Sequence, residues 1–318
     1  MSYRIGVDLG GTNIAAGLVD ENNTIVKKIS CKTNLPLPRE AIEEKIANLC
    51  RQLVKETNIT FADILWVGIG TPGSVNSKLG VVGFNANFGY YDWHLTDAVQ
   101  KLLSCKVYAE NDANAAAYGE YVAGAAKGTS IAVAITLGTG IGAGVIIDGK
   151  IFTGFNCAGA EIGHTVIEMD GRHCMCGRSG CWEKYASARA LTEDTKAAMQ
   201  QNKDTIMWQI VDGNIDNVNA KTAFDGMRKG DETASKLVDN FVKYVSCGLV
   251  NVINIFQPEI ICIGGGVSKE GDALLDRLRS YIDKEDYART SHLRTRICVA
   301  TLRNDAGIIG AAALGELA

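Results

Sequence analysis

The sequence predicts an α/β protein built from two related lobes, and three observations support this fold class. A pattern of strand, glycine turn and strand near the N-terminus returns 128 residues later. Each copy is followed by a helical segment and then by a buried strand, as expected for an α/β layer. The repeats share four identities in fourteen positions, and the identical pairs are Leu9/Leu137, Gly10/Gly138, Ala15/Ala143 and Asp20/Asp148. Four matches alone are compatible with chance, but the shared order of elements favours duplication.

The length and composition suit two globular domains with sizeable cores. The chain has 318 residues, of which 47% are hydrophobic and 21% are charged. The formal net charge of -4 gives no reason to expect nucleic acid or an anionic membrane as a partner. The longest apolar stretch, residues 131–147, is interrupted by glycines and threonines and is not expected to span a membrane.

The ten cysteines would suit a secreted protein, but seven of them are scattered singly along the chain. These seven are Cys31, Cys50, Cys105, Cys157, Cys247, Cys262 and Cys298. No signal-peptide pattern precedes the first strand, so we expect these thiols to be reduced and to pack as small apolar groups. The sequence therefore predicts a cytoplasmic protein.

The first half of the chain opens with three short strands and a helix. Strands are expected at residues 4–7, 14–19 and 24–30, because apolar runs there are bounded by turn residues. Apolar residues at helical spacing predict a helix over residues 39–58, and a buried strand at 64–70 follows it.

The second half repeats this order with a helical insertion. Helices are expected over residues 187–212 and 232–256, and a buried strand over 259–263. Pro258 helps to end the second of these helices, because proline cannot continue it.

A final alanine-rich helix over residues 304–317 has Asp305 as a candidate N-cap. We expect this helix to pack back on the first lobe and to tie the two lobes together. The predicted small N-terminal lobe is then residues 1–118 with residues 304–318. The predicted large lobe is residues 119–303, and a cleft separates the two lobes.

Two glycine turns, Gly10-Gly11-Thr12 and Gly138-Thr139-Gly140, occupy matching positions in the two copies. Without a Cβ, the backbone N–H groups of such a turn can approach an anion closely. Tight hairpins need glycine in any case, but two matched turns that face one cleft favour phosphate binding. Asp8 precedes the first turn and could hold a hydrated Mg²⁺ or cap its own turn. The flat patch Gly264-Gly265-Gly266 after a buried strand suits adenine or ribose.

The segment Glu110-Asn111-Asp112-Ala113-Asn114 lies between a strand expected at residues 106–109 and an alanine-rich helix that runs to about Gly124. Asn and Asp are common N-cap residues, and one of the two is expected to cap this helix. Three consecutive polar residues exceed what a cap requires. An aspartate at a strand end near the cleft can accept the proton of an attacking hydroxyl, and Asp112 is our candidate.

One histidine and three cysteines lie in a short glycine-rich stretch, and the four are His164, Cys174, Cys176 and Cys181. Imidazole and thiolate form a recurring ligand set for tetrahedral Zn²⁺, and four protein ligands would make the ion structural. A disulfide between Cys174 and Cys176 would be strained, and ordinary core cysteines prefer apolar runs. Zinc is therefore the favoured interpretation, with the flanking carboxylates of Glu161 and Glu183 turned toward a hydroxylated substrate.

These features together resemble the ROK family (repressor, open reading frame, kinase) over nearly the whole chain. The most specific parts are Glu161-x-Gly163-His164 and the cysteine segment from Cys174 to Glu183. The resemblance implies the actin-like, or ribonuclease-H-like, duplicated ATPase fold. Its pattern is most similar to that of the zinc-containing bacterial glucokinases of the family.

By that likeness, Asp112 is the general base, and zinc is held by His164, Cys174, Cys176 and Cys181. Sugar hydroxyls would be bound by Asn111, Glu161, His164 and Glu183, with Asn87 as a further ligand. The likeness puts the family's first phosphate loop at Asp8-Leu-Gly10-Gly11-Thr12. With the second glycine turn, the ATP phosphates would be bound by Asp8, Gly10, Gly11, Thr12, Asn13, Gly138, Thr139 and Gly140, and adenine or ribose would lie on Gly264, Gly265 and Gly266. Asn13 is a mild departure from the family, whose members often carry lysine there; we expect it to alter the phosphate end of the site and to leave the general base unaffected.

The resemblance implies ATP- and Mg²⁺-dependent phosphorylation of a hexose, most simply glucose, by a homo-oligomer such as a dimer. Another acceptor, for example N-acetylmannosamine, fructose or allose, remains open because pocket shape decides specificity. A sugar-responsive repressor of the same family is a second alternative. We expect no DNA-binding domain here, because the first strand begins within a few residues of Met1. An actin-like assembly protein would leave the zinc segment without a role.

Overall fold

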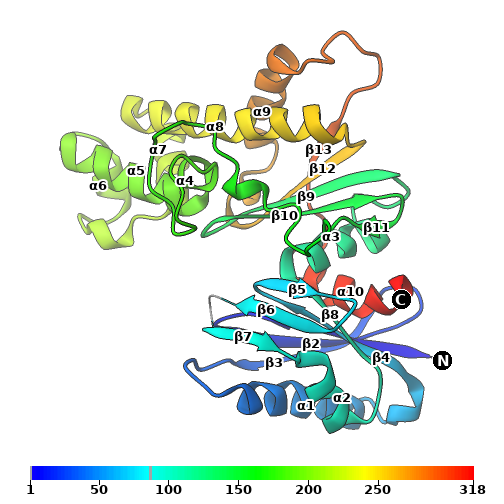
Figure 1. Cartoon of the computed structure of the whole chain (residues 1–318). Coiled ribbons are helices and arrows are strands. Elements are labelled where there is room, and N and C mark those ends of the chain that lie inside the picture. Colours follow the sequence, from blue (N-terminus) through cyan, green and yellow to red (C-terminus); the bar gives the residue numbers. More distant parts are fainter. Residues whose placement is uncertain (1, 86–87) are drawn as a thin grey trace. The chain divides into compact units, whose positions relative to one another are not determined.

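The computed structural model describes residues 2–85 and 88–318 (Figure 1). The chain divides into two compact units. The first comprises Met1–Ala134, Gly144–Ala160 and Ala300–Ala318, and the second comprises Ile135–Ala143 and Glu161–Val299. The lobe boundaries that the sequence suggested remain a prediction.

The first five-stranded sheet has the strand order β3-β2-β1-β4-β8. Its strands are β1 (Tyr3–Leu9), β2 (Asn13–Val19), β3 (Ile25–Lys32), β4 (Ile64–Thr71) and β8 (Val107–Asn111). Strand β2 pairs antiparallel with β1 and β3, whereas β1, β4 and β8 run parallel to one another. Parallel strands end at the same edge of a sheet, so the carboxyl ends of β1, β4 and β8 form one edge.

Helices cover both faces of this sheet (Figure 1). Helices α1 (Arg39–Glu56) and α2 (Leu95–Leu103) close the face that buries Ile5, Val7 and Leu9. Helices α3 (Asp112–Ala123) and α10 (Ala306–Ala313) pack together on the other face. A Cβ on Gly6 would lie 1.9 Å from a backbone oxygen of α10, so glycine permits this close approach. The terminal helix therefore packs on the first unit, as the sequence predicted.

A second five-stranded sheet has the order β11-β10-β9-β12-β13. Its strands are β9 (Ile131–Leu137), β10 (Ile141–Ile147), β11 (Lys150–Ile151), β12 (Ile260–Gly264) and β13 (Arg296–Val299). Strands β9 and β10 have the bounds of β1 and β2 shifted by 128 residues, and the strand order matches that of the first sheet. The duplication inferred from sequence is thereby confirmed at the level of topology.

The remaining strands form a small sheet that the sequence did not predict. Its strands are β5 (Ser74–Asn76), β6 (Val81–Asn85) and β7 (Tyr90–Trp93), and they pair in chain order. The strands are short and contain glycine and asparagine, so they lack the alternation that marks a half-buried strand.

Six α-helices belong to the second unit, and α8 is the longest of them. They are α4 (Glu183–Ala186), α5 (Ala188–Gln201), α6 (Met207–Ile210), α7 (Ala220–Arg228), α8 (Glu232–Phe256) and α9 (Asp272–Glu285). The bounds of α8 are those predicted from sequence. The single helical segment predicted over residues 187–212 is instead split into α5 and α6 by a break at Asn202–Ile206.

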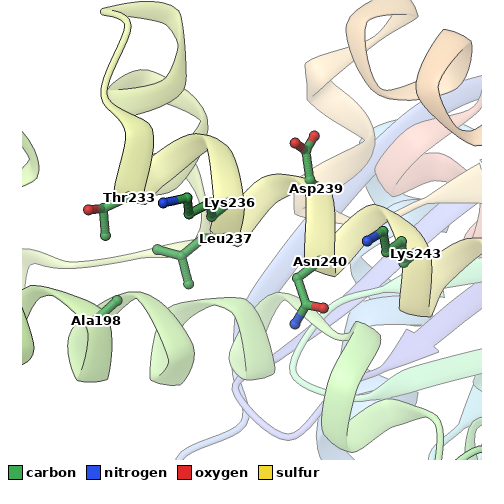
Figure 2. Close-up of a pocket in the computed structure, with 7 residues that line it drawn as sticks. All are labelled: Ala198, Thr233, Lys236, Leu237, Asp239, Asn240 and Lys243. Carbon is green, nitrogen blue, oxygen red and sulfur yellow. The ribbon is translucent and has the colours of Figure 1, made fainter.

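An open groove of about 530 Å³ runs along α5 and α8 (Figure 2). Its lining residues are Ala198, Thr233, Lys236, Leu237, Asp239, Asn240 and Lys243. None of them belongs to the predicted site. Among the helices of the described residues, none is both long enough and apolar enough to cross a membrane.

The predicted N-cap at Asp305 differs in detail from the structure. Asp305 does precede α10, but its side chain makes no capping hydrogen bond. Its carboxylate instead lies 2.5 Å from Nζ of Lys28 on β3, and this ion pair replaces the cap.

Candidate active site and metal site

Strand register brings two predicted residues from distant parts of the sequence to one sheet edge. Asp8 on β1 lies opposite Gly70 on β4, and Gly70 lies opposite Glu110 on β8. Asp112 follows β8 directly as the first residue of α3. Its charge contributes to the raised pKa of Asp8, so the two carboxylates act on each other electrostatically. Carboxyl ends of parallel strands are where α/β proteins commonly place ligands.

Asn111 serves as the N-cap of α3, as the sequence analysis expected of one of these residues. Its Oδ1 accepts hydrogen bonds from the backbone N–H of Ala113 at 2.9 Å and of Asn114 at 3.1 Å. Its Nδ2 donates to the carbonyl oxygen of Gly73 at 3.0 Å. An amide group has two N–H donors, so one remains for a ligand hydroxyl.

Asp112 is half-buried at the start of α3. Burial is the main cause that raises the pKa of its carboxyl above the ordinary value, and a backbone hydrogen bond from Ala113 opposes it. A raised pKa makes the ionised carboxylate a better proton acceptor. The position and the electrostatics of Asp112 therefore suit a general base.

Glu110 has a structural role that the sequence did not reveal. Its side chain is buried, and Oε1 accepts hydrogen bonds from the backbone N–H of Asn111 at 2.8 Å and from Nδ2 of Asn114 at 3.1 Å. Ser77, in the loop after β5, donates a further bond. Burial raises the pKa of this carboxyl despite these bonds. Glu110 thus fixes the backbone on which Asn111 and Asp112 stand.

The first glycine turn is held closed by a hydrogen bond from the N–H of Gly10 to the carbonyl oxygen of Asn13 at 3.0 Å. Asp8 lies one residue before the end of β1 and is half-buried. Burial first, and then the charge of Asp112, raises the pKa of Asp8 to about 6, while Lys28 opposes the shift. A carboxylate that is costly to ionise gains most from a nearby cation, which fits the predicted Mg²⁺ role.

The second glycine turn is closed by a hydrogen bond from the N–H of Gly138 to the carbonyl oxygen of Gly140 at 3.0 Å. The patch Gly264-Gly265-Gly266 begins at the end of β12. Gly265 has a φ of 87°, and a Cβ there would lie 2.3 Å from the carbonyl oxygen of Leu137 at the end of β9. The patch Gly264–Gly266 therefore lies against the end of β9, the strand that leads into the second glycine turn.

The four predicted zinc ligands come together in the second unit. The ligand atoms of His164, Cys174, Cys176 and Cys181 all lie within 4.8 Å of one another. Sγ of Cys176 is 3.6 Å from Sγ of Cys181, and Sγ of Cys174 is 3.7 Å from Nδ1 of His164. Bonds of the usual Zn–S length give tetrahedral edges of roughly 3.8 Å, so the spacing fits the ion. All three cysteines are free, which excludes the disulfide alternative in this structure.

Tight backbone turns hold this cluster in place. The N–H of Cys174 donates to the carbonyl oxygen of Arg178 at 2.8 Å, and the N–H of Gly177 donates to that of Cys174 at 3.0 Å. Gly177 has a φ of 90°, a conformation that favours glycine. The ring of Trp182 follows the cluster and packs against Gly248 of α8, where a Cβ would lie 2.0 Å from the ring. The cluster is therefore anchored on the longest helix.

The predicted sugar ligands in the second unit surround the cluster. Nδ1 of His164 faces the sulfur atoms, which leaves Nε2 for a ligand. Glu183, the first residue of α4, has Oε1 at 3.8 Å from that Nδ1. Glu161 precedes the short 3-10 helix that contains His164, and it is exposed.

One predicted sugar ligand, Asn87, lies outside the described residues. Its neighbour Asn85, at the end of β6, is fully buried and donates from Nδ2 to the carbonyl oxygen of Pro72 at 2.6 Å. This bond joins β6 to the segment after β4. This role of Asn85 could not be predicted from the sequence, because its partner is thirteen residues away.

Comparison with known proteins gives a consistent result. The model of the ROK family matches residues 4–317. The chain is 40% identical over 317 residues to a glucokinase from Thermotoga maritima, covering 98% of this chain and 96% of that protein. It is 36% identical over 318 residues to a glucokinase from Streptomyces coelicolor, covering 99% and 98%. The structure of a ROK family glucokinase from Streptomyces griseus in complex with glucose and AMPPNP matches with a TM-score of 0.84 at 34% identity, covering 100% of both chains.

Proposed function

The chain belongs to the ROK family, and we propose that it is a glucokinase that transfers the γ-phosphoryl group of ATP to the 6-hydroxyl of glucose. It has the duplicated actin-like ATPase fold, with one five-stranded sheet of the same strand order in each half. The observation that carries the proposal is the full-length similarity to proteins named glucokinase.

We assign the general base to Asp112. In the proposed reaction, oxygen O6 of the sugar forms a bond to the γ-phosphorus of ATP while the bond from that phosphorus to the β–γ bridging oxygen breaks. Asp112 takes the proton of the 6-hydroxyl and later releases it to solvent, and the products are ADP and glucose 6-phosphate. The half-buried position of Asp112 and its raised pKa support this role.

We assign the binding of sugar hydroxyls to Asn87, Asn111, Asp112, Glu161, His164 and Glu183. Carboxylates and amides suit this task because they accept and donate the hydrogen bonds that hydroxyl groups need. The two glycine turns, with Asp8, Asn13 and the patch at Gly264–Gly266, are assigned to ATP. Mg²⁺, when bound, neutralises charge on the phosphate oxygens, and Asp8 would hold it through water.

The zinc ion is assigned a structural role, because His164 and three cysteines fill a tetrahedral site. Bound zinc would fix the ring of His164 at one angle and leave Nε2 directed toward the sugar. We further propose a cytoplasmic homodimer with no nucleic-acid partner. Light scattering coupled to gel filtration measures the oligomeric state.

A panel of sugars tests the proposed function. ADP release is measured with Mg·ATP and each of glucose, fructose, allose, mannose and N-acetylmannosamine. Glucose is expected to give the highest kcat/KM. If glucose gives no ADP release and another sugar does, that sugar replaces glucose as the proposed acceptor, and the proposed phosphoryl transfer stands. Absence of ADP release with every sugar would overturn the kinase proposal in favour of a regulator.

A further inference from the structure

The residue that follows β3 is bonded to the first glycine turn at two points. Thr33 is fully buried, and its Oγ1 donates to the carbonyl oxygen of Gly10 at 2.7 Å. Its backbone N–H donates to the carbonyl oxygen of Thr12 at 2.9 Å. One residue, twenty-three positions along the chain from Gly10, therefore satisfies two carbonyl groups of the turn.

These two bonds set the direction of two peptide groups. In a trans peptide, the C=O and the following N–H point in opposite directions. Anchoring the carbonyl of Gly10 on Thr33 thus directs the N–H of Gly11 away from Thr33. Anchoring the carbonyl of Thr12 does the same for the N–H of Asn13.

The first glycine turn consequently directs the N–H of Gly11 away from Thr33, on the side open to a ligand. Within residues 2–85 and 88–318, the N–H groups of Gly11 and Thr12 have no acceptor. Gly11 is half-buried and Thr12 is exposed. The N–H of Gly11, which is directed away from Thr33, and the adjacent unpartnered N–H of Thr12 are therefore available to an anion, as in other anion-binding turns.

The last residue of β3 adds a positive charge beside this concavity. Lys32 is the register partner of Asn13, so their side chains lie on the same face of the sheet. Asp8 pairs with Ala15, and Ala15 pairs with Ser30, two positions before Lys32. Side chains two positions apart on a strand share a face, so Lys32 and Asp8 lie on one face.

The ammonium group of Lys32 is available for a ligand. It is exposed, and no acidic side chain among the described residues forms an ion pair with it. Lys28, on the same face, is paired with Asp305. Asn13 carries no charge, so Lys32 is the cation adjacent to the turn in strand register.

We propose that Lys32 and Thr33 complete the nucleotide phosphate site, with Thr33 as a positioning residue and Lys32 as a direct ligand of a phosphate oxygen. This inference rests on the proposed function, since it takes ATP as the ligand of the turn. Thr33 would orient the peptide groups of the turn before the nucleotide arrives. Lys32 would then neutralise part of the phosphate charge.

The variant Thr33→Val removes the hydroxyl of Thr33 and keeps its shape, and Thr33→Ser restores the hydroxyl. The dissociation constant of Mg·ADP is measured by calorimetry, and the KM values for ATP and glucose by coupled assay. Thr33→Val is expected to raise the ADP dissociation constant and the ATP KM by roughly three- to tenfold, the range for one hydrogen bond. The glucose KM should be unchanged, and Thr33→Ser should restore nucleotide affinity.

Lys32→Ala is compared with Lys27→Ala as a matched control. Lys27 lies on the same strand but pairs in register with Leu18, on the opposite face, and its Nζ is 3.0 Å from Glu56. Lys32→Ala is expected to weaken Mg·ADP binding by roughly tenfold and to reduce its dependence on salt. Lys27→Ala should bind Mg·ADP as the parent does.

Two results would overturn the inference while leaving the proposed function intact. An unchanged ADP dissociation constant in Thr33→Val, or a fall in melting temperature without a change in nucleotide affinity, would show that Thr33 only stabilises the fold. If Lys32→Ala binds Mg·ADP as tightly as the parent protein does, Lys32 is not a ligand of a phosphate oxygen. A parent protein that neither binds ADP nor phosphorylates a sugar would instead reject the proposed function.

Discussion

The carboxylate of Glu183 contacts the zinc cluster and the second glycine turn at once. Its Oε1 lies 3.1 Å from Sγ of Cys174. Its Oε2 lies against Gly140, where a Cβ would be only 2.4 Å away. The position of Glu183, a proposed sugar ligand, therefore depends on the zinc cluster and on Gly140, and each of these contacts can be altered separately.

Replacing Cys176 by alanine tests the cluster. The variant should lose its zinc ion, because three remaining ligands bind the metal weakly, and its glucose KM should rise by roughly tenfold or more. Zinc is measured by mass spectrometry of the metal, and the KM by coupled assay. Cys105→Ser is the control, since Cys105 lies outside the cluster. A Cys176→Ala protein with full zinc and an unchanged KM would rule out the proposal that the zinc cluster places His164 for the sugar.

Replacing Gly140 by alanine tests the other contact of Glu183. The added Cβ would displace Oε2, and a shift of this kind at a ligand can lower kcat/KM for glucose by roughly a hundredfold. Zinc content should stay normal. The matched control is Gly83→Ala, because Gly83 lies outside both glycine turns and a Cβ there meets only the carbonyl oxygen of Ser74, at 3.8 Å. Equal effects of the two substitutions on glucose would argue against the role of the Gly140 contact.

Replacing Asp8 by asparagine should stabilise the protein at neutral pH while impairing turnover. Burial and Asp112 raise the pKa of Asp8 from 3.8 to about 6 in the folded protein. Above pH 6 the carboxyl is ionised in both states, and the charge costs more in the folded state than in the unfolded one, so it lowers stability. The gain in unfolding free energy should be about 3 kcal/mol at pH 7 and should vanish as the pH falls from 6 to 4. Denaturant unfolding of parent and variant across this range measures it. Equal stabilities at pH 7 would contradict the shift.

Replacing Glu110 by glutamine tests the support of the catalytic segment. Glu110 now accepts hydrogen bonds from the N–H of Asn111 and from Nδ2 of Asn114. Glutamine has one oxygen and one NH₂ group, so a donor would face a donor and one hydrogen bond would be lost or rearranged. We expect kcat to fall by roughly tenfold or more, because Asn111 and Asp112 would shift, with little change in the ATP KM. Steady-state kinetics separates the two. A large rise in ATP KM at constant kcat would disagree with this role.

The sequence predicted those parts of the fold that depend on local pattern. The hairpin of β1 and β2, its copy 128 residues later, and helix α8 all follow from apolar periodicity and turn residues. The zinc ligands were also predictable, because the residue types and their spacing specify the chemistry.

Other features depend on strand register and long-range contacts, which periodicity does not report. Thr33 meets Gly10 only because β3 pairs with β2, and Glu110 meets Ser77 only because β5 follows β4 closely. No proline marks the break between α5 and α6, where Nε1 of Trp208 donates to the carbonyl oxygens of Met199 at 3.0 Å and Asn202 at 3.3 Å. The sheet of β5, β6 and β7 was missed because its strands are too short to show a period.

The most direct test of the central claim is phosphorus NMR of glucose and Mg·ATP incubated with the parent protein and with Asp112→Asn. The parent is predicted to produce ADP and glucose 6-phosphate in equal amounts. Asp112→Asn is predicted to lose roughly a thousandfold or more of this rate while still binding Mg·ADP. A parent that forms no glucose 6-phosphate, or an Asp112→Asn variant that forms it at the parental rate, would contradict the account.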